Sequence, residues 1–223
     1  MQVLIPHPGM YVETHSEKIL RALDEVITCD WRARFQEIAD HIGALAKDLL
    51  LLREWTSAVA SKPKLPELSG AQSFVVYQSN TMFARINIWF PKGNLGSKLD
   101  AYRRYLSIEE LHNHDFNFFT TRLLGPGYVS AFYRGPSADR IFSPGEKLEL
   151  HPLGKIELSN DKVLFVEKDL DYHSQEWVDE LTVTLNIIPR SRLGGVQYLV
   201  DDKKRTVNFV IDNRARAQLD DLS

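Results

Sequence analysis

The chain has 223 residues, of which 43% are hydrophobic and 26% are charged, and its formal net charge is −3. This composition is typical of a soluble globular protein with a sizeable core, and it excludes disordered, collagen-like and disulfide-built chains. Acidic and basic residues are interspersed, which argues against nucleic-acid and anionic-membrane partners. The single cysteine, Cys29, has no internal disulfide partner and fits a cytoplasmic location. We expect no signal peptide, and the apolar run at 49–52 is too short to span a membrane.

Residues 1–66 are predicted to form an extended arm followed by two helices. Thr14 or Ser16 offers an N-cap for the first helix. The second helix is expected from Trp31 to about Ala60, where a proline-containing segment ends it. The apolar residues at helical spacing are Ile19, Leu20, Leu23, Val26 and Ile27 in the first helix, and Phe35, Ile38, Ile42, Leu45, Leu49 and Leu52 in the second. We expect this hairpin to pack on the rest of the chain, and a homodimer interface is the alternative.

Residues 67–223 are predicted to form a mainly β domain. β-branched and aromatic residues recur in short runs separated by turn sequences, and no helix long enough for a parallel crossover interrupts them. This pattern is typical of an antiparallel sandwich or barrel. A short helix is expected within 99–111. The expected strands cover 73–78, 82–90, 127–134, 147–153, 154–159, 162–168, 180–188, 196–200 and 205–212, besides one that begins near Leu111.

Two histidines separated by one residue, His112 and His114, are the first candidates for a functional site. Alternation along a strand places both imidazoles on one face, where two neutral imidazoles can bind one metal ion. A protein-bound divalent metal normally has at least three protein ligands. His151 and His173 are the candidates for the third. We favour His173, because it lies at a turn between two expected strands, where its side chain can point into a barrel mouth.

These motifs resemble the two sequence blocks of the cupin superfamily, whose fold is a double-stranded β-helix, a jelly-roll barrel. The residues that carry the resemblance are His112-Asn113-His114, Gly125-Pro126-Gly127, Val163-Leu164-Phe165-Val166 and His173. The resemblance covers about residues 71–200. Cupins usually have a glutamate after three or four intervening residues beyond the second histidine, where this chain has Phe118 and Phe119. In that respect the chain is similar to the cysteine dioxygenase-like branch, in which three histidines hold iron(II).

The resemblance implies a non-haem iron(II) dioxygenase or oxygenase that acts with dioxygen on a small organic molecule bearing a carboxylate or an amine. Zinc, nickel or manganese at the same histidines would imply a lyase, isomerase or epimerase that uses the metal as a Lewis acid. A non-catalytic cupin-like binding or regulatory module is the third alternative. The sequence contains no phosphate-binding loop, nucleophile elbow or dinucleotide fingerprint that would indicate another class of enzyme.

Other side chains are candidates for the surroundings of the metal. Strict alternation from His112 would place Arg122 on the ligand face as a clamp for a carboxylate, whereas a β-bulge would turn it to solvent. Tyr128 and Tyr133 are candidates for hydrogen bonds to substrate or oxygen, although such aromatic residues more often pack. The candidates for orienting the imidazoles are Asp115, Tyr172, Gln175 and Glu176.

The expected strand at 180–188 has one aliphatic face and one polar face. Thr184 and Asn186 belong to the polar face. We favour the interpretation that this face meets solvent, and the alternative is that it lines a polar pocket.

Overall fold

The structure is a computed structural model that describes residues 1–4, 16–28, 31–48, 73–136, 140–159, 161–190 and 195–213. The strands are β1 (Gln2–Leu4), β2 (Ser73–Gln78), β3 (Met82–Trp89), β4 (Leu111–Asn113), β5 (Phe118–Leu124), β6 (Val129–Arg134), β7 (His151–Glu157), β8 (Val163–Val166), β9 (Asp171–Gln175), β10 (Thr182–Pro189), β11 (Val196–Asp201) and β12 (Thr206–Asp212). The helices are α1 (Ser16–Thr28), α2 (Phe35–Lys47) and α4 (Leu99–Leu106), with 3-10 turns at Trp31–Arg34, Lys92–Asn94 and Gly96–Lys98. No helix in these ranges is long and apolar enough to cross a membrane.

The strand order is that of a double-stranded β-helix. One six-stranded sheet has the order β1-β8-β5-β10-β3-β2, and the other has the order β12-β11-β4-β9-β6-β7. Between β3 and β10 the chain crosses repeatedly from one sheet to the other, and the paired strands are antiparallel. The predicted mainly β, cupin-like jelly-roll barrel with an N-terminal helical hairpin is therefore confirmed. The start of the predicted arm is itself a strand, because β1 pairs with β8 and extends the first sheet.

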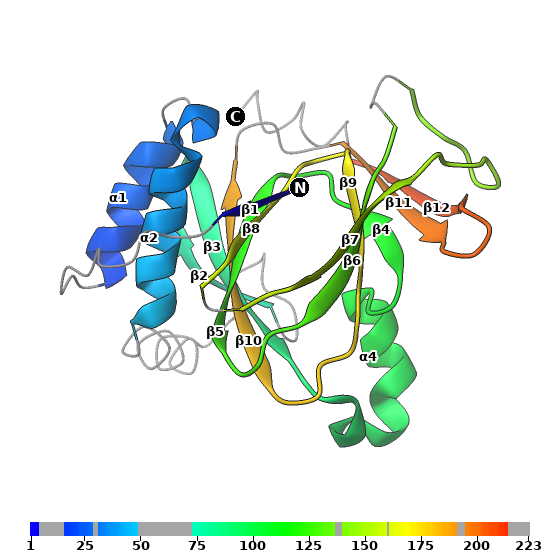
Figure 1. Cartoon of the computed structure of the whole chain (residues 1–223), viewed down its shortest axis with the longest axis horizontal. Helices are drawn as coiled ribbons and strands as arrows, with labels where there is room; N and C mark the ends of the chain where they lie inside the picture. Colours follow the sequence, from blue (N-terminus) through cyan, green and yellow to red (C-terminus); the bar gives the residue numbers. More distant parts are fainter. Residues whose placement is uncertain are drawn as a thin grey trace.

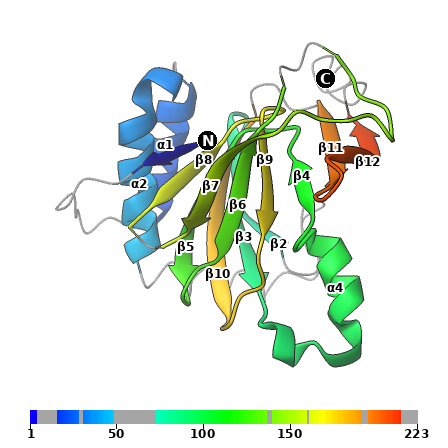
Figure 2. The ribbon, with the colours of Figure 1, turned by 45° about the vertical axis from the view of Figure 1, so that its right-hand side comes forward.

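The helical hairpin covers the outer face of the first sheet (Figures 1 and 2). Its buried residues, among them Leu23 and Ile42, form one core with aliphatic side chains of β3 and β10. α2 ends at Lys47, where Asp48 is extended and donates its N–H to the carbonyl of Leu45. The predicted continuation of this helix to Ala60 and the predicted domain boundary at residue 66 lie outside the described residues.

Alternation on β3 and β10 divides the molecule into two compartments. The even-numbered residues of β3 and the odd-numbered residues of β10 pack against the helices, whereas the opposite faces turn into the barrel. Thr184 and Asn186 are buried on that inner face, so the favoured expectation that they meet solvent is wrong. The reason is the helical hairpin, which takes up the aliphatic face and leaves the polar face inside.

The strands in the second half of the barrel lie where the sequence predicted them, with small shifts in their boundaries. The two strands expected at 147–153 and 154–159 are one strand, β7, which bends at Gly154 with a φ of +105°. The short helix expected within 99–111 is α4.

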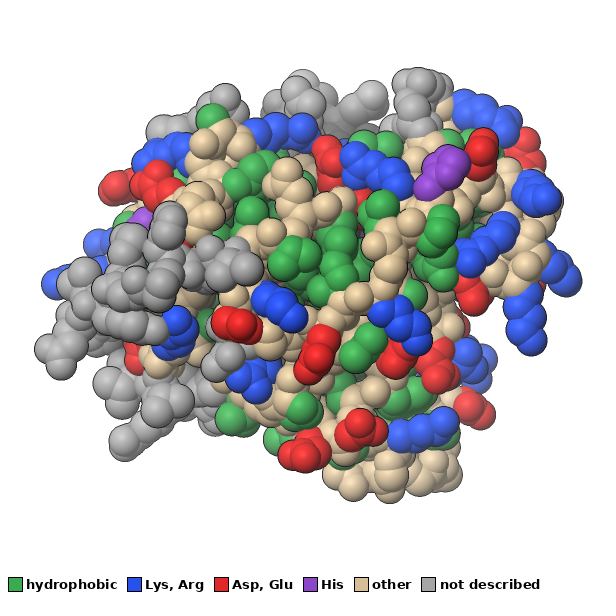
Figure 3. Space-filling model, viewed as in Figure 1, with side chains coloured by type: hydrophobic (Ala, Val, Ile, Leu, Met, Phe, Trp, Pro, Cys, Tyr) green, Lys and Arg blue, Asp and Glu red, His purple; other side chains and the backbone are tan. Residues whose placement is uncertain are grey.

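On the face of the molecule seen in Figure 3, acidic and basic side chains are interspersed.

Candidate metal centre

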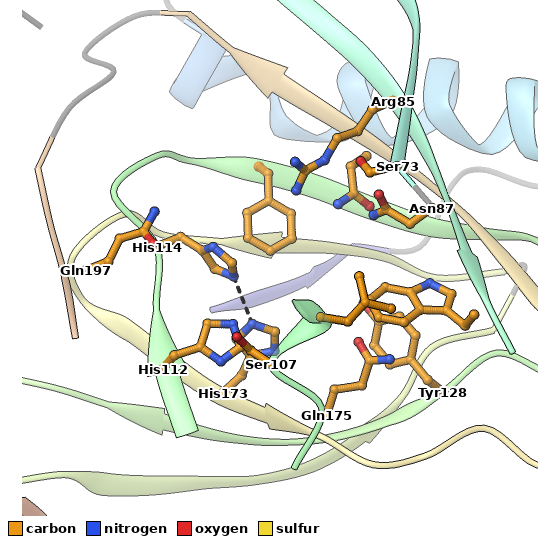
Figure 4. Close-up of a pocket in the computed structure, with 14 residues that line it drawn as sticks. Ser73, Arg85, Asn87, Ser107, His112, His114, Tyr128, His173, Gln175 and Gln197 are labelled. Carbon is orange, nitrogen blue, oxygen red and sulfur yellow. Dashed lines mark hydrogen bonds between the residues drawn. The ribbon is translucent and has the colours of Figure 1, made fainter. Parts of the chain in front are cut away.

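Three histidines from two neighbouring segments meet inside the barrel. β4 pairs with β9, and this pairing sets His112 directly opposite His173. His114 follows the end of β4, where the chain starts to cross toward β5. One ring nitrogen from each of the three imidazoles lies within 4.8 Å of the other two. Figure 4 shows the three rings pointing toward one another.

The spacing of the ring nitrogens fits a shared metal ion. Nε2 of His114 lies 2.9 Å from Nε2 of His173. Two imidazole nitrogens bound to one ion at about 2.1 Å, and about 90° apart as seen from it, would be about 3.0 Å apart. Among the described residues no carboxylate belongs to this cluster. The geometry and the donor chemistry therefore fit a three-histidine site.

The protein holds these imidazoles in the neutral form that a metal requires. Burial lowers the pKa of His112, although its hydrogen bond to the carbonyl of Glu110 opposes the shift. Burial lowers the pKa values of His114 and His173 further, and the proximity of other cationic groups, His112 above all, adds to the effect. Neutral imidazole is the ligand form of histidine, so the site is ready to bind a cation without first losing protons.

His112 is also fixed in one tautomer. Its Nδ1 donates to the carbonyl oxygen of Glu110 at 2.8 Å, which leaves Nε2 as the free ligand atom. The neighbouring N–H of Glu109 donates to the carbonyl of Gln175 at 2.8 Å and thereby anchors this loop to β9. Phe132 stacks on the ring of His173 at 5.5 Å. Nδ1 of His173 is buried and has no hydrogen-bond partner among the described residues.

A cavity of about 390 Å³ opens beside the histidines. Figure 4 shows Arg85, Ser73 and Asn87 together on one side of it, contributed by β2 and β3, and Gln175 and Tyr128 at the other side. Trp89 and Phe118 also contribute to the wall. The cavity thus has a cationic side and a side of aromatic and amide groups, with the histidines beside both.

Arg85 is a functional candidate that the sequence argument missed. Its guanidinium lies 5.6 Å from the centre of the Phe116 ring, and its Nε is buried without a partner among the described residues. Burial lowers its pKa to about 10, so it remains a cation at neutral pH. A signal was present, because Arg85 is the one charged residue in the otherwise mostly apolar run at 82–90. An arginine on the inner face of a barrel strand indicates a binding role for an anion.

The position of Arg122 corrects the expectation of a clamp there. The prediction extended one strand from His112. In the structure β4 ends at Asn113 and residues 114–117 cross to the other sheet, but the parity is kept on β5, where Phe118 lines the cavity and Arg122 lies opposite Thr184. The guanidinium of Arg122 donates to the carbonyl of Gly125 and does not line the cavity.

Tyr133 and Glu176 also lie away from the cavity. The guanidinium of Arg205 lies 4.3 Å from the centre of the Tyr133 ring. Glu176 forms an exposed ion pair with Lys155 at 2.5 Å. Neither residue lines the cavity, so the structure does not support the roles expected of Tyr133 and Glu176 there.

The residues expected to orient the imidazoles have other partners. Asp115 accepts hydrogen bonds from the side chains of Gln197 and Asn213. Tyr172 belongs to a separate apolar core under β11 and β12. Gln175 lines the cavity, and its Nε2 reaches none of the imidazoles. The orienting group that the structure does show is the backbone carbonyl of Glu110.

Tyr128 does line the cavity, as the sequence suggested. Burial raises its pKa to about 12, so its hydroxyl is neutral at physiological pH, and it is hydrogen-bonded to Thr120. The hydroxyl of Thr120 in turn donates to Oδ1 of Asn186 at 2.8 Å. Tyr128 is thereby held in place by a short chain of polar side chains within the barrel.

Comparisons with known proteins give only distant matches. No protein-family model and no curated protein matches the chain. Among solved structures, a hydroquinone 1,2-dioxygenase in complex with Cd2+ and 4-hydroxybenzonitrile is similar at 12% identity and a TM-score of 0.36, over 57% of this chain and 69% of that one. A hydroquinone 1,2-dioxygenase from Sphingomonas sp. TTNP3 with 4-hydroxybenzoate bound is similar at 9% identity and a TM-score of 0.36, over 57% and 70%.

An uncharacterised protein with a double-stranded β-helix domain from Klebsiella pneumoniae is similar at 10% identity and a TM-score of 0.31, over 60% of this chain and 89% of that one. Scores this low carry no argument about function. The assignment of the fold rests on the strand order described above.

Proposed function

We propose that the protein is a metal-dependent enzyme, and specifically a non-haem iron(II) oxygenase that acts on a small anionic organic molecule. The observation that supports it most directly is the convergence of His112, His114 and His173 beside a cavity, three neutral imidazoles of which His173 is buried and the other two are half-buried. Such a set is a recognised catalytic ligand set, because three protein ligands leave further metal positions for substrate.

Iron(II) is the metal that we propose for this site. Three neutral ligands leave the full charge of a divalent cation uncompensated, which favours an anionic substrate. Phe118, whose ring lies 4.9 Å from that of His114, stands where a carboxylate ligand is usual in cupins, so the set agrees with the three-histidine branch that the sequence resembles. Iron(II) held there would supply the redox chemistry with dioxygen that an organic substrate alone lacks.

Other residues of the chain bind the substrate and hold the histidines in position. Arg85 binds the anionic group of the substrate as a preformed cation that has no ion-pair partner among the described residues. The carbonyl of Glu110 holds His112 in the tautomer that exposes Nε2. Phe118 and Phe132 pack against His114 and His173, which restricts the orientation of these two rings. Tyr128 stays protonated and places an uncharged ring beside the substrate.

The test is elemental analysis of protein purified without oxygen, followed by oxygen-uptake measurements with a panel of small carboxylates. We expect close to one iron per chain, and uptake with at least one carboxylate. His112→Ala, His114→Ala and His173→Ala should each lose the iron, whereas His151→Ala, on exposed β7, should keep it. Full iron occupancy in His112→Ala would overturn the ligand assignment. Stoichiometric zinc without oxygen uptake would replace the oxygenase by a Lewis-acid enzyme.

A further inference from the structure

Gln175 carries a buried amide that is not satisfied within the described part of the protein. The residue is 4% exposed, and its Nε2 has no hydrogen-bond partner there. Ser130 lies opposite Gln175 in the pairing of β6 with β9, and its hydroxyl is also buried without a described partner. Buried polar groups in native proteins are nearly always hydrogen-bonded, so two neighbouring unpaired groups indicate a position where a ligand binds.

The strand directs Gln175 toward the candidate metal centre. Gln175 follows His173 by two residues on β9, so both side chains lie on the inner face of the barrel. The amide lines the same cavity as the histidines. Figure 4 shows it beside Tyr128, on the side of the cavity away from Arg85.

Two other hydrogen-bond donors that line this end of the cavity, on Trp89 and Tyr128, already have partners, and Ser130 does not line the cavity. The indole N–H of Trp89 donates to the hydroxyl of Thr184 at 3.0 Å. The hydroxyl of Tyr128 is hydrogen-bonded to Thr120. Their rings therefore offer flat apolar surfaces, and Gln175 is left as the donor that can identify a polar atom on a bound molecule.

We propose that Gln175 determines substrate specificity by donating a hydrogen bond from Nε2 to an acceptor atom on the end of the substrate away from its anionic group. The substrate class is then a small carboxylate that carries a neutral carbonyl or ether oxygen at its other end. Arg85 binds the carboxylate, and Trp89 and Tyr128 flank the acceptor end. This inference rests on the proposed binding of an anionic substrate, and it adds a second point of recognition.

The experiment compares acids that share a carboxylate and differ only at the acceptor. The pairs are 4-oxopentanoate with 4-methylpentanoate, and 4-acetylbenzoate with 4-isopropylbenzoate. Their dissociation constants are measured by calorimetry without oxygen, in the iron-loaded and the metal-free protein. We expect the oxo acid of at least one pair to bind about tenfold more tightly than its hydrocarbon partner, which is the effect of one satisfied buried hydrogen bond.

Gln175→Leu removes the amide and keeps most of the volume, so it should bind both acids of that pair equally. Gln197→Leu is the matched control: Gln197 also lines the cavity, but its amide already donates to Asp115, so the preference should remain. Arg85→Gln should weaken both acids alike and leave their ratio unchanged. If Gln175→Leu fails to fold, as judged by circular dichroism, Gln175→Met gives the same comparison.

A ratio of the two dissociation constants near one in both pairs, measured with the wild-type protein, would overturn the proposal. A preference for the oxo acid that survives in Gln175→Leu would overturn it too. Failure of all four acids to bind would overturn it as well. The oxygenase proposal fails on other grounds, namely iron content and oxygen uptake. The binding ratio is read in the metal-free protein too, so the two failures are distinguishable.

Discussion

The guanidinium of Arg85 places a positive charge in the barrel wall without a described anion beside it. A half-buried charge without a partner destabilises the folded protein, and it is retained where a ligand needs it. Arg85→Met removes the charge and keeps an unbranched chain of similar length. We expect this variant to unfold in urea with a free energy on the order of 1–3 kcal/mol higher than the wild type. It should also bind 4-oxopentanoate at least tenfold more weakly, and a variant that loses stability would contradict the assignment of an unpaired cation.

His41, a helical histidine that the sequence did not assign to the site, gives a pH prediction. Burial on α2 lowers its pKa, against the opposing effect of Glu37 and Asp40. The unfolded chain therefore takes up a proton at this residue first, and stability falls as the pH drops below about 6.5. His41→Gln has no proton to take up there. Urea unfolding between pH 7.5 and 5 should show the wild type losing stability relative to the variant as the pH falls, and a constant difference would refute the prediction.

The effect of a residue on β5 depends on which compartment it faces. Phe119 is fully buried against the helical hairpin, with ring centroids 5.7 Å from Phe35 and 4.9 Å from Phe165. Phe118 is its neighbour in sequence, and it lines the cavity instead. Phe119→Ala should lower the free energy of unfolding by about 3–5 kcal/mol. Phe118→Ala should cost less in the same urea titration, because the Phe118 ring borders the cavity, and equal losses would contradict this difference.

The Gly-Pro-Gly turn that connects β5 to β6 has a strict backbone requirement. Gly127 has a φ of +96°, and a Cβ there would overlap the carbonyl oxygen of Leu158 on the neighbouring segment. Gly127→Ala should therefore lower the melting temperature strongly or prevent folding, because alanine disfavours this positive φ and its Cβ would have no space. Gly93→Ala is the control, since nothing lies within 4 Å of its position. A Gly127→Ala protein as stable as the control would contradict the turn geometry.

The elements show which parts of the structure the sequence could predict. Helical spacing located α1 and the first half of the second predicted helix, and strand alternation located β2, β3 and β10, because these patterns are local. The change of sheet at residues 114–117 was not local, because it depends on strand pairing. The parity from His112 to Arg122 is kept, but Arg122 bonds the carbonyl of Gly125 and does not line the cavity, and no local pattern predicts that. The inward direction of Asn186 likewise depends on the hairpin that covers the other face.

For the molecule as a whole, metal binding should add to stability. The three imidazoles meet only in the folded state, because they come from β4, the segment after it and β9, so a metal binds the native form in preference. At a free metal concentration of about one hundred times the dissociation constant, the stabilisation is about 2.7 kcal/mol. Wild-type protein should show this increase in urea unfolding with iron(II) under nitrogen or with zinc. His114→Ala should not, and an equal increase in the variant would indicate metal binding elsewhere.

The barrel could be predicted from the sequence, but the side chains that line its cavity could be predicted only in part. The metal-ligand candidates followed from a spacing in the sequence and from a resemblance. Arg85 and Gln175 sit on strands whose inner faces become known only when both sheets are assembled. Side chains that converge from distant strands leave no common pattern in the sequence. For that reason the residues of the cavity wall could not be predicted from the sequence.

The placement of one of the hydrophobic cores outside the barrel, under the helical hairpin, has a consequence for how this protein can change. Much of the apolar packing lies between the helical hairpin and the first sheet, while Arg85, Asn87, Thr184 and Asn186 occupy the inner face of the same strands. Substitutions on the inner face therefore alter the chemistry of the cavity without removing the packing that holds the sheet to the helices. A library randomised at Asn87 and Asn186 should retain many folded members, so the barrel is a scaffold on which new substrate preferences can be selected.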